Sequence, residues 1–114
     1  MPELPEVEVT RLGLKPLLRQ KVKEVTIRNH SLRWPIDSQL PEILKKQTLL
    51  GLNRRGKYIL VSFTSGTLII HLGMSGRLCI VSSDEPLSKH DHVDILFKEN
   101  NLILRYRDPR RFGS

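Results

Sequence analysis

The sequence has little cysteine, few aromatic rings and no long apolar run. Cys79 is the one cysteine among 114 residues, so the chain by itself forms neither an internal disulfide nor a cysteine-based metal site. Cys79 lies in a strand-like apolar run, where we expect a buried, inert thiol. Aromatic residues make up 5% of the chain, too few for a stacking surface of several rings. No stretch approaches the roughly 18 apolar residues of a membrane span, and the acidic start excludes a secretory signal, so we expect a cytoplasmic protein without a membrane partner.

Acidic residues are scarce relative to basic ones. Nineteen Lys and Arg against twelve Asp and Glu give a net charge of +7. This excess points to a polyanionic partner, most simply nucleic acid, although basic domains also bind membranes or acidic proteins. With 114 residues and 39% hydrophobic content, the chain is expected to form one globular domain around one core.

The apolar pattern predicts an α+β fold. A helix is expected from Pro5 to about residue 14, weakened by Gly13 and Pro16, and a short second helix over 38–46 is capped by Asp37. Alternating or apolar segments predict strands over 21–28, 48–53, 57–63, 67–72, 76–81, 92–97 and 102–106. Short strands with regularly spaced turns indicate a sandwich or barrel, and we expect a two-layer antiparallel β-sandwich flanked by the two helices.

The first eight residues carry two prolines and three carboxylates. If Met1 is removed, Pro2 becomes a free secondary amine, and an α-amino group has a pKa of about 7.7–8.0. Such an amine can attack an electrophilic carbon and hold it as an iminium, with Glu3 and Glu6 as proton carriers within one helical turn. The alternative is purely structural, because proline and acidic residues both favour the first turn of a helix.

Two turns carry further candidate residues. The run Arg54-Arg55-Gly56-Lys57 is either a solvated turn or a phosphate-binding one, and the Lys57 amine, if held near Pro2, could assist elimination. Met74 lies in a glycine-flanked turn, where it either packs locally or acts as an apolar wedge inserted between bases.

The C-terminal turn and one loop offer a second group. In Asp108-Pro109-Arg110-Arg111-Phe112-Gly113, the guanidinium groups could bind phosphate or base edges and the ring could stack, or the turn is a basic surface with a core Phe. Lys89-His90-Asp91-His92 suggests a metal pair, but Asp91 is expected to point away from the two histidines and no further ligand is evident. A phosphate contact from His90 is therefore favoured over a metal.

Six stretches together resemble one family, the N-terminal domain of bacterial formamidopyrimidine-DNA glycosylase. The resemblance covers all 114 residues, and the motifs occur in the family's order. They are Met1-Pro2-Glu3-Leu4-Pro5-Glu6-Val7-Glu8, Arg33-Trp34-Pro35, Arg54-Arg55-Gly56-Lys57-Tyr58, His71-Leu72-Gly73-Met74-Ser75-Gly76, Lys89-His90-Asp91-His92-Val93-Asp94 and Asp108-Pro109-Arg110-Arg111-Phe112-Gly113.

The resemblance implies a base-excision-repair enzyme, both DNA glycosylase and AP lyase. Nothing in the sequence suggests a dimerisation element, so we expect a monomer. It would remove oxidised purines such as 8-oxoguanine and formamidopyrimidines from double-stranded DNA, and act on abasic sites, through a Schiff base and β,δ-elimination without a catalytic metal. Pro2 then resembles the nucleophile, Glu3 the acid/base, Glu6 a supporting carboxylate and Lys57 the proton donor for β-elimination. The residues that resemble DNA contacts are His71, Met74, His90, Arg110 and Phe112, of which Met74, Arg110 and Phe112 fill the gap left by the flipped base.

The family continues beyond such a domain. Its helix-two-turn-helix region and four-cysteine zinc finger are absent from these 114 residues, so one structural zinc is expected in that region and no cofactor in this chain. We therefore expect the 114-residue fragment to bind DNA weakly and to have little or no activity. The alternatives are a non-catalytic DNA-binding module or remnant, an interaction domain for an acidic protein, and an endonuclease VIII-like enzyme for oxidised pyrimidines, which usually has glycine in place of Leu4.

Overall fold

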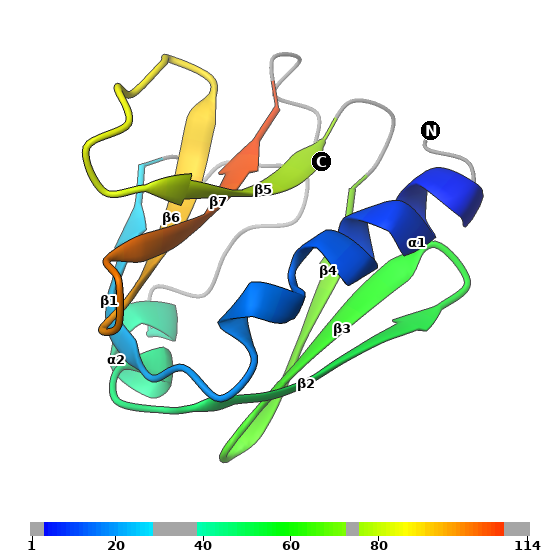
Figure 1. The fold of residues 1–114 in the computed structure, drawn as a ribbon, viewed down its shortest axis with the longest axis horizontal. Coiled ribbons are helices and arrows are strands. Elements are labelled where there is room, and N and C mark those ends of the chain that lie inside the picture. Colours follow the sequence, from blue (N-terminus) through cyan, green and yellow to red (C-terminus); the bar gives the residue numbers. More distant parts are fainter. Residues whose placement is uncertain (1–3, 29–38, 73–75, 109–114) are drawn as a thin grey trace.

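In the described part of the chain, seven strands and two short helices follow one another (Figure 1). The computed structural model describes residues 4–28, 39–72 and 76–108. The helical elements are α1 (Leu4–Gly13), a 3-10 turn (Lys15–Leu17) and α2 (Leu40–Leu44). The strands are β1 (Val22–Ile27), β2 (Leu49–Arg55), β3 (Tyr58–Phe63), β4 (Gly66–His71), β5 (Arg77–Ser82), β6 (Asp91–Phe97) and β7 (Leu102–Arg107).

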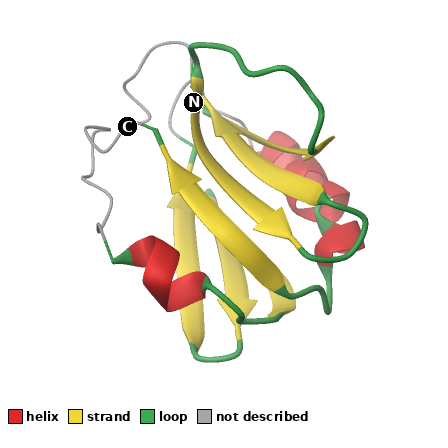
Figure 2. Ribbon diagram, turned by 90° about the vertical axis from the view of Figure 1, so that its left-hand side faces the viewer, coloured by secondary structure: helices red, strands yellow, loops and turns green. Residues whose placement is uncertain are grey.

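The strands form two antiparallel sheets that pack face to face. One sheet has the order β1-β6-β7-β5 and the other β2-β3-β4. Hydrogen bonds from Arg19 N to Leu49 O (2.7 Å) and from Val22 N to Gln47 O (2.8 Å) join the sheets along one edge. The helices α1 and α2 lie at opposite sides of the two layers (Figure 2). The predicted two-layer antiparallel sandwich with two flanking helices is confirmed.

Apolar side chains from both sheets and from α1 fill the space between the layers. In β3, Ile59, Val61 and Phe63 are buried and alternate with more exposed neighbours, as a strand with one face inward requires. In α1, Val7 is fully buried, whereas Leu12 is 41% exposed. Val7 and Leu12 are both apolar, but only Val7 faces the core, so the buried face of the helix is narrower than its sequence indicates.

The element boundaries follow the sequence closely. The helix α1 ends at Gly13, and the chain continues as a 3-10 turn that begins just before Pro16. The second helix is shorter than expected, five residues with Pro41 in its first turn. Its N-cap is Gln39, so the expected cap by Asp37, which lies outside the described residues, is wrong because the helix begins later than predicted. None of the described helices is long and apolar enough to cross a membrane.

Candidate nucleic-acid interface

Several strand ends and the start of α1 lie at one end of the sandwich, along the top and the right of Figure 1. Strand β3 begins where β4 ends, since Tyr58 pairs with His71. Strand β7 ends between the starts of two neighbours, because Arg107 pairs with both Arg77 and Asp91. The predicted site residues Glu6, Lys57, His71 and His90 belong to these ends and the adjoining turns.

A hollow of about 260 Å³ opens between α1 and the β5–β7 pair. Two arginines and one carboxylate, Arg77, Arg107 and Glu6, contribute to its lining. The remaining lining residues are Thr10, Leu72, Gly76, Leu78 and Cys79. This mixture of cationic donors, a carboxylate acceptor and apolar walls is suited to a ligand that carries both hydrogen-bond donors and acceptors. Arg77 and Arg107 are not among the predicted site residues. The sequence hints at them only because Arg77 directly follows the motif 71–76 and Arg107 directly precedes the motif 108–113.

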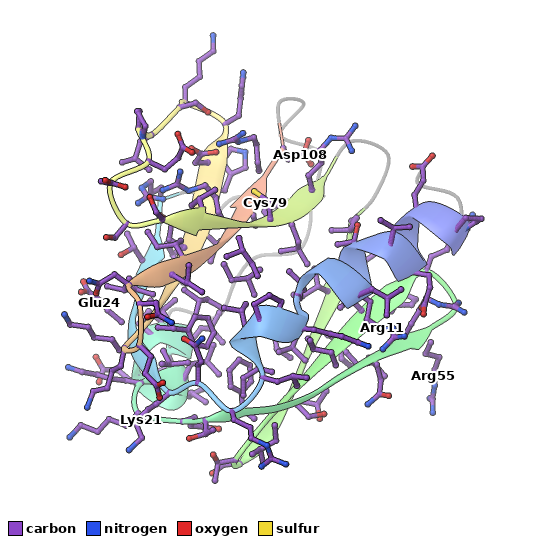
Figure 3. The ribbon with its side chains drawn as sticks, viewed as in Figure 1. Arg11, Lys21, Glu24, Arg55, Cys79 and Asp108 are labelled. Atoms are coloured by element: carbon purple, nitrogen blue, oxygen red, sulfur yellow. The ribbon has the colours of Figure 1, made fainter. Side chains whose placement is uncertain are left out.

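Cys79 differs from its expected surroundings. It is half-buried rather than buried and lies in the wall of this hollow (Figure 3). Its partial burial raises the pKa of the thiol, so the group stays protonated near neutral pH. The expectation of a buried thiol is therefore wrong in degree, while the raised pKa agrees with low reactivity.

Glu8 joins α1 to the β2–β3 hairpin. Its carboxylate accepts hydrogen bonds from Arg11 (3.0 Å to Nε) and from Arg54 (3.1 Å to Nε). The hydrogen bonds from Arg11 and then Arg54 lower the pKa of Glu8 to about 2. Arg11 also donates to Leu52 O on β2 (3.1 Å), so the helix and hairpin are linked through two arginines.

The hairpin turn beside this link carries the predicted basic tetrad. Gly56 has a φ of +58°, a conformation that side chains other than glycine rarely adopt, and its carbonyl accepts a bond from Arg54 Nη1 (3.0 Å). Arg55 extends from the turn away from the sandwich (Figure 3), while Lys57 is half-buried. Of the three cations in this turn, Arg55 points outward, Arg54 is bonded to Glu8 and to Gly56 O, and Lys57 is half-buried.

The two predicted histidine contacts occupy different environments. His71 is half-buried, and its ring lies against that of Tyr58 with centroids 4.8 Å apart. His90 lies in the loop before β6, where its backbone nitrogen donates to Ser88 Oγ (3.2 Å) and its carbonyl accepts from Asp108 N (3.0 Å).

His92 does not share the surface of His90. It is buried, and its Nε2 lies 2.8 Å from the carbonyl oxygen of Asp108, so this nitrogen carries the proton. Asp91 is buried as well and forms an ion pair with Arg107. A shift in register between Asp91 and Val93 brings both neighbours inside, which simple strand alternation does not predict.

A buried ionic network runs beneath this edge. Arg105 is 1% exposed and donates to both carboxylate oxygens of Asp94, at 2.9 and 3.0 Å. Arg28 adds a third bond to Asp94 at 2.9 Å. Burial by itself would raise the pKa of Asp94, but the hydrogen bonds from Arg105 and Arg28 outweigh it and hold the pKa below its ordinary value. The same balance, with Arg107 as the main donor, lowers the pKa of Asp91.

Within 4–28, 39–72 and 76–108, no group of three or more His, Cys, Asp or Glu side chains is placed to hold a metal ion. The remaining predicted site residues, Pro2, Glu3, Met74, Arg110 and Phe112, lie outside the described residues. Among the predicted site residues that are described, Lys57 and His71 are adjacent through the pairing of Tyr58 with His71, Glu6 lines the hollow together with Arg107, and His90 is bonded to Asp108 directly after β7.

Comparison with known proteins gives consistent matches. Over residues 1–114 the chain matches the family model described as formamidopyrimidine-DNA glycosylase N-terminal domain. It is 57% identical over 114 residues to the formamidopyrimidine-DNA glycosylase of Methylobacillus flagellatus, covering all of this chain and 40% of that protein. A second such enzyme, from Saccharophagus degradans, is 57% identical over 115 residues, covering all of this chain and 42% of that protein.

Solved structures agree. An inhibited LlFpg in complex with DNA containing N7-benzyl-Fapy-dG has a TM-score of 0.89 at 35% identity, over 97% of this chain and 41% of that one. Lactococcus lactis formamidopyrimidine-DNA glycosylase bound non-covalently to AP-site DNA has a TM-score of 0.87 at 34% identity, over 97% and 43%. The chain thus spans about two fifths of the length of these relatives. It belongs to the formamidopyrimidine-DNA glycosylase family, to the part that the family model describes as the N-terminal domain.

Proposed function

We propose that this chain is the N-terminal catalytic domain of a DNA glycosylase and AP lyase that removes oxidised purines from double-stranded DNA. The observation that carries the proposal is the meeting of the start of α1, the Lys57 turn and the hollow at one edge of the sandwich. Imine chemistry on a sugar requires an amine nucleophile, a proton donor and a carboxylate; in the proposal Pro2, Lys57 and Glu6 supply these groups. Relatives of the same fold have been solved with lesion-containing or abasic DNA, which supports the substrate class.

The covalent step begins at the N-terminus. After removal of Met1, the lone pair of the Pro2 nitrogen attacks C1′ of the damaged nucleotide, the bond from C1′ to the base breaks, and the base leaves with a proton. Glu3 acts as the acid/base that delivers this proton to the base or the sugar. The C1′–O4′ bond then breaks and O4′ takes up the proton released from the Pro2 nitrogen, which leaves an iminium between Pro2 and C1′, while Glu6 supports the site as a second carboxylate.

Strand cleavage follows from the iminium. Its positive charge acidifies the C2′–H bond; loss of that proton expels the 3′ phosphate, and a second elimination expels the 5′ phosphate. Lys57 donates the proton in the β-elimination and contacts a phosphate. Hydrolysis of the remaining iminium returns the Pro2 amine, so no metal takes part in the scheme.

DNA recognition is assigned to the same edge and its loops. The net charge of +7 favours binding to the phosphate backbone, with His71, His90 and Arg110 as contacts. Extrusion of the damaged nucleotide costs a few kcal/mol of unstacking, and Met74, Arg110 and Phe112 offset this cost by filling the gap. The full-length protein is proposed to continue into a helix-two-turn-helix region and a zinc finger, without which the 114-residue fragment binds weakly and turns over little.

Borohydride trapping tests the proposal. Borohydride reduces an iminium to a stable amine, so the full-length protein should form a covalent adduct with abasic-site DNA, and Pro2→Gly should reduce the adduct strongly while DNA affinity is largely kept. Intact mass must first establish that Met1 is absent. A protein that binds DNA but forms no adduct would be a non-catalytic binding module. Preferential excision of oxidised pyrimidines would place it with endonuclease VIII instead.

A further inference from the structure

Two arginines lie opposite each other on neighbouring strands, in the wall of the hollow. Arg77, the first residue of β5, pairs directly with Arg107, the last residue of β7, and both side chains line the hollow. Like charges directly opposite each other on antiparallel strands destabilise a sheet. A bound anion would offset this repulsion, because each guanidinium group can donate two parallel hydrogen bonds to phosphate or carboxylate oxygens.

The protein itself compensates these two charges only in part. Arg77 is exposed, and no carboxylate of the described residues forms an ion pair with it. Arg107 donates to both carboxylate oxygens of Asp91, at 2.5 and 3.4 Å, yet its side chain stays 38% exposed. Asp91 also lies 3.5 Å from Arg105 Nη1, so two guanidinium groups share its one negative charge.

The buried ionic network beside the arginine pair is positive as well. Asp94 accepts hydrogen bonds from both Arg105 and Arg28. The network as a whole holds three guanidinium groups for two carboxylates, and Arg77 adds a further cation beside it. Glu6 is the one carboxylate among the described residues that line the hollow, against two guanidinium groups. This excess of positive charge favours an anionic ligand.

The size and the place of the hollow favour a phosphate of DNA. Pockets that enclose a drug-sized ligand have about 300–1,000 Å³. This hollow has about 260 Å³, so it suits a phosphate group better than a whole nucleotide. Leu72 in its wall directly follows the predicted DNA contact His71, so the arginine pair lies beside the predicted path of the DNA.

We propose that Arg77 and Arg107 together bind one backbone phosphate of the DNA. The inference rests on the proposed function, because it extends the predicted DNA contacts to the ends of β5 and β7. Asp91 holds the guanidinium group of Arg107 in place, and Arg77 supplies the charge that no described carboxylate compensates. Such a contact positions the duplex and carries no sequence information of its own.

The salt dependence of DNA binding tests this contact. The full-length protein is titrated with a duplex that carries a non-cleavable abasic-site analogue, between about 50 and 200 mM NaCl. Each neutralised phosphate contributes about 0.9 to the slope of the logarithm of the binding constant against the logarithm of the salt concentration. Arg77→Gln should lower the slope by about 0.9, so its loss of affinity should shrink about 3.5-fold across this range. Arg77→Lys, which keeps the charge, should retain the slope.

Lys21→Gln is the matched control. Lys21 is exposed and lies at the opposite end of the sandwich from Cys79, which lines the hollow (Figure 3). This variant removes one positive charge as Arg77→Gln does, but it should leave the slope unchanged. Arg77→Gln should not lower the unfolding midpoint, because it relieves the repulsion from Arg107, whereas a merely structural arginine would lower it.

Three results would overturn the inference. They are an unchanged slope for Arg77→Gln, an equal change for Lys21→Gln, and a reduction near 1.8 for the double variant Arg77→Gln/Arg107→Gln, which would mean two separate phosphates. Thermal stabilisation by inorganic phosphate that Arg77→Gln abolishes, combined with an unchanged DNA slope, would assign the pair to a free anion and overturn the inference too. The slope does not depend on turnover, so a wild-type protein without a borohydride adduct would overturn the proposed function alone.

Discussion

Replacement of Asp94 by asparagine tests whether the buried ionic network holds the β6–β7 pair together. The side chain of Asp94 is 6% exposed and that of its partner Arg105 is 2% exposed. Asp94→Asn removes the charge that compensates this guanidinium, keeps one oxygen as an acceptor and changes the side-chain volume little. The substitution therefore isolates the electrostatic contribution from packing.

The expected loss follows from the geometry. Removing one partner of a buried ion pair costs about 3–5 kcal/mol, because the other charge remains buried and uncompensated. Arg105 Nη1 also lies 3.5 Å from Asp91 Oδ2, and this second carboxylate remains, so we expect the lower end, about 3 kcal/mol. A domain of this size has about 5–15 kcal/mol of unfolding free energy in total. The unfolding midpoint should therefore fall by roughly 10–20 °C.

Urea unfolding of the chain at pH 7, followed by circular dichroism, measures the loss. The matched control is Glu8→Gln, because Glu8 also accepts bonds from two arginines but lies at the surface. Surface ion pairs contribute little to stability, so the urea midpoint of Glu8→Gln should differ only slightly from that of wild type. A change for Asp94→Asn as small as that for Glu8→Gln would refute the reasoning, since it would mean that water compensates Arg105.

The difference in unfolding free energy between wild type and Asp94→Asn should also depend on pH, which adds a second check. The pKa of Asp94 is held below its ordinary value of 3.8, so the folded state favours the carboxylate. The stabilisation is then fully present above the unfolded pKa and is lost as the pH falls through the lower folded pKa. The difference in unfolding free energy between wild type and Asp94→Asn should stay constant from pH 5 to 8 and become smaller only below about pH 4.

Three further predictions concern single positions. Gly76→Ala should destabilise severely, since its Cβ would lie 2.2 Å from Leu72 O, whereas Gly13→Ala, with no atom within 4 Å, should stabilise by about 0.5–1 kcal/mol in thermal unfolding. Cys79 has a raised pKa, so iodoacetamide should alkylate it more slowly than a free cysteine at pH 8; mass spectrometry showing equal rates would contradict its partial burial. NMR titration of the Glu8 carboxyl should give a pKa below the ordinary 4.5, and an unshifted value would mean that the two arginines do not engage it.

The strands were predictable because their apolar residues repeat with a period of two around one buried face. The segment 57–63 predicts β3 within one residue, and 102–106 predicts β7 likewise. Helix ends followed from Gly13 and Pro16, which cannot extend a regular α-helix without cost. At these positions the preferences of neighbouring residues along the chain agree with the final fold, so the local sequence was sufficient to predict the strands and the helix ends.

The interior charges were not predictable in this way. Arg105 is the bulkiest of the fully buried side chains, although basic residues are normally assigned to the surface. Its burial depends on pairing across strands, since Asp94 lies directly opposite it on β6. The register shift between Asp91 and Val93 then places two successive residues inside. Opposite charges spaced two or three apart on two neighbouring strands were the only hint in the sequence.

The candidate site was predictable mainly through the family resemblance. Glu6 and Lys57 lie fifty residues apart, and only the packing of α1 against the hairpin brings their elements together. The sequence contains no local signal for such a long-range contact. The roles proposed for Pro2 and Glu3 remain predictions, and the arginines that line the hollow were not foreseen at all.

The proposed site has one part that is joined to the three-stranded sheet and another that belongs to the four-stranded sheet. The core residues that hold the two sheets in place relative to each other are therefore important for activity. The start of α1 is joined through Glu8 and Arg54 to β2, in the three-stranded sheet. Arg77 and Arg107, which line the hollow, belong to β5 and β7 in the four-stranded sheet. Reacting groups must be held within about 0.5 Å of their working geometry, so the separation of the two sheets is itself a functional distance. Because α1 packs against β2 and β3 as well as β5, the buried Val7 face of this helix is the element that spans both sheets and fixes that distance.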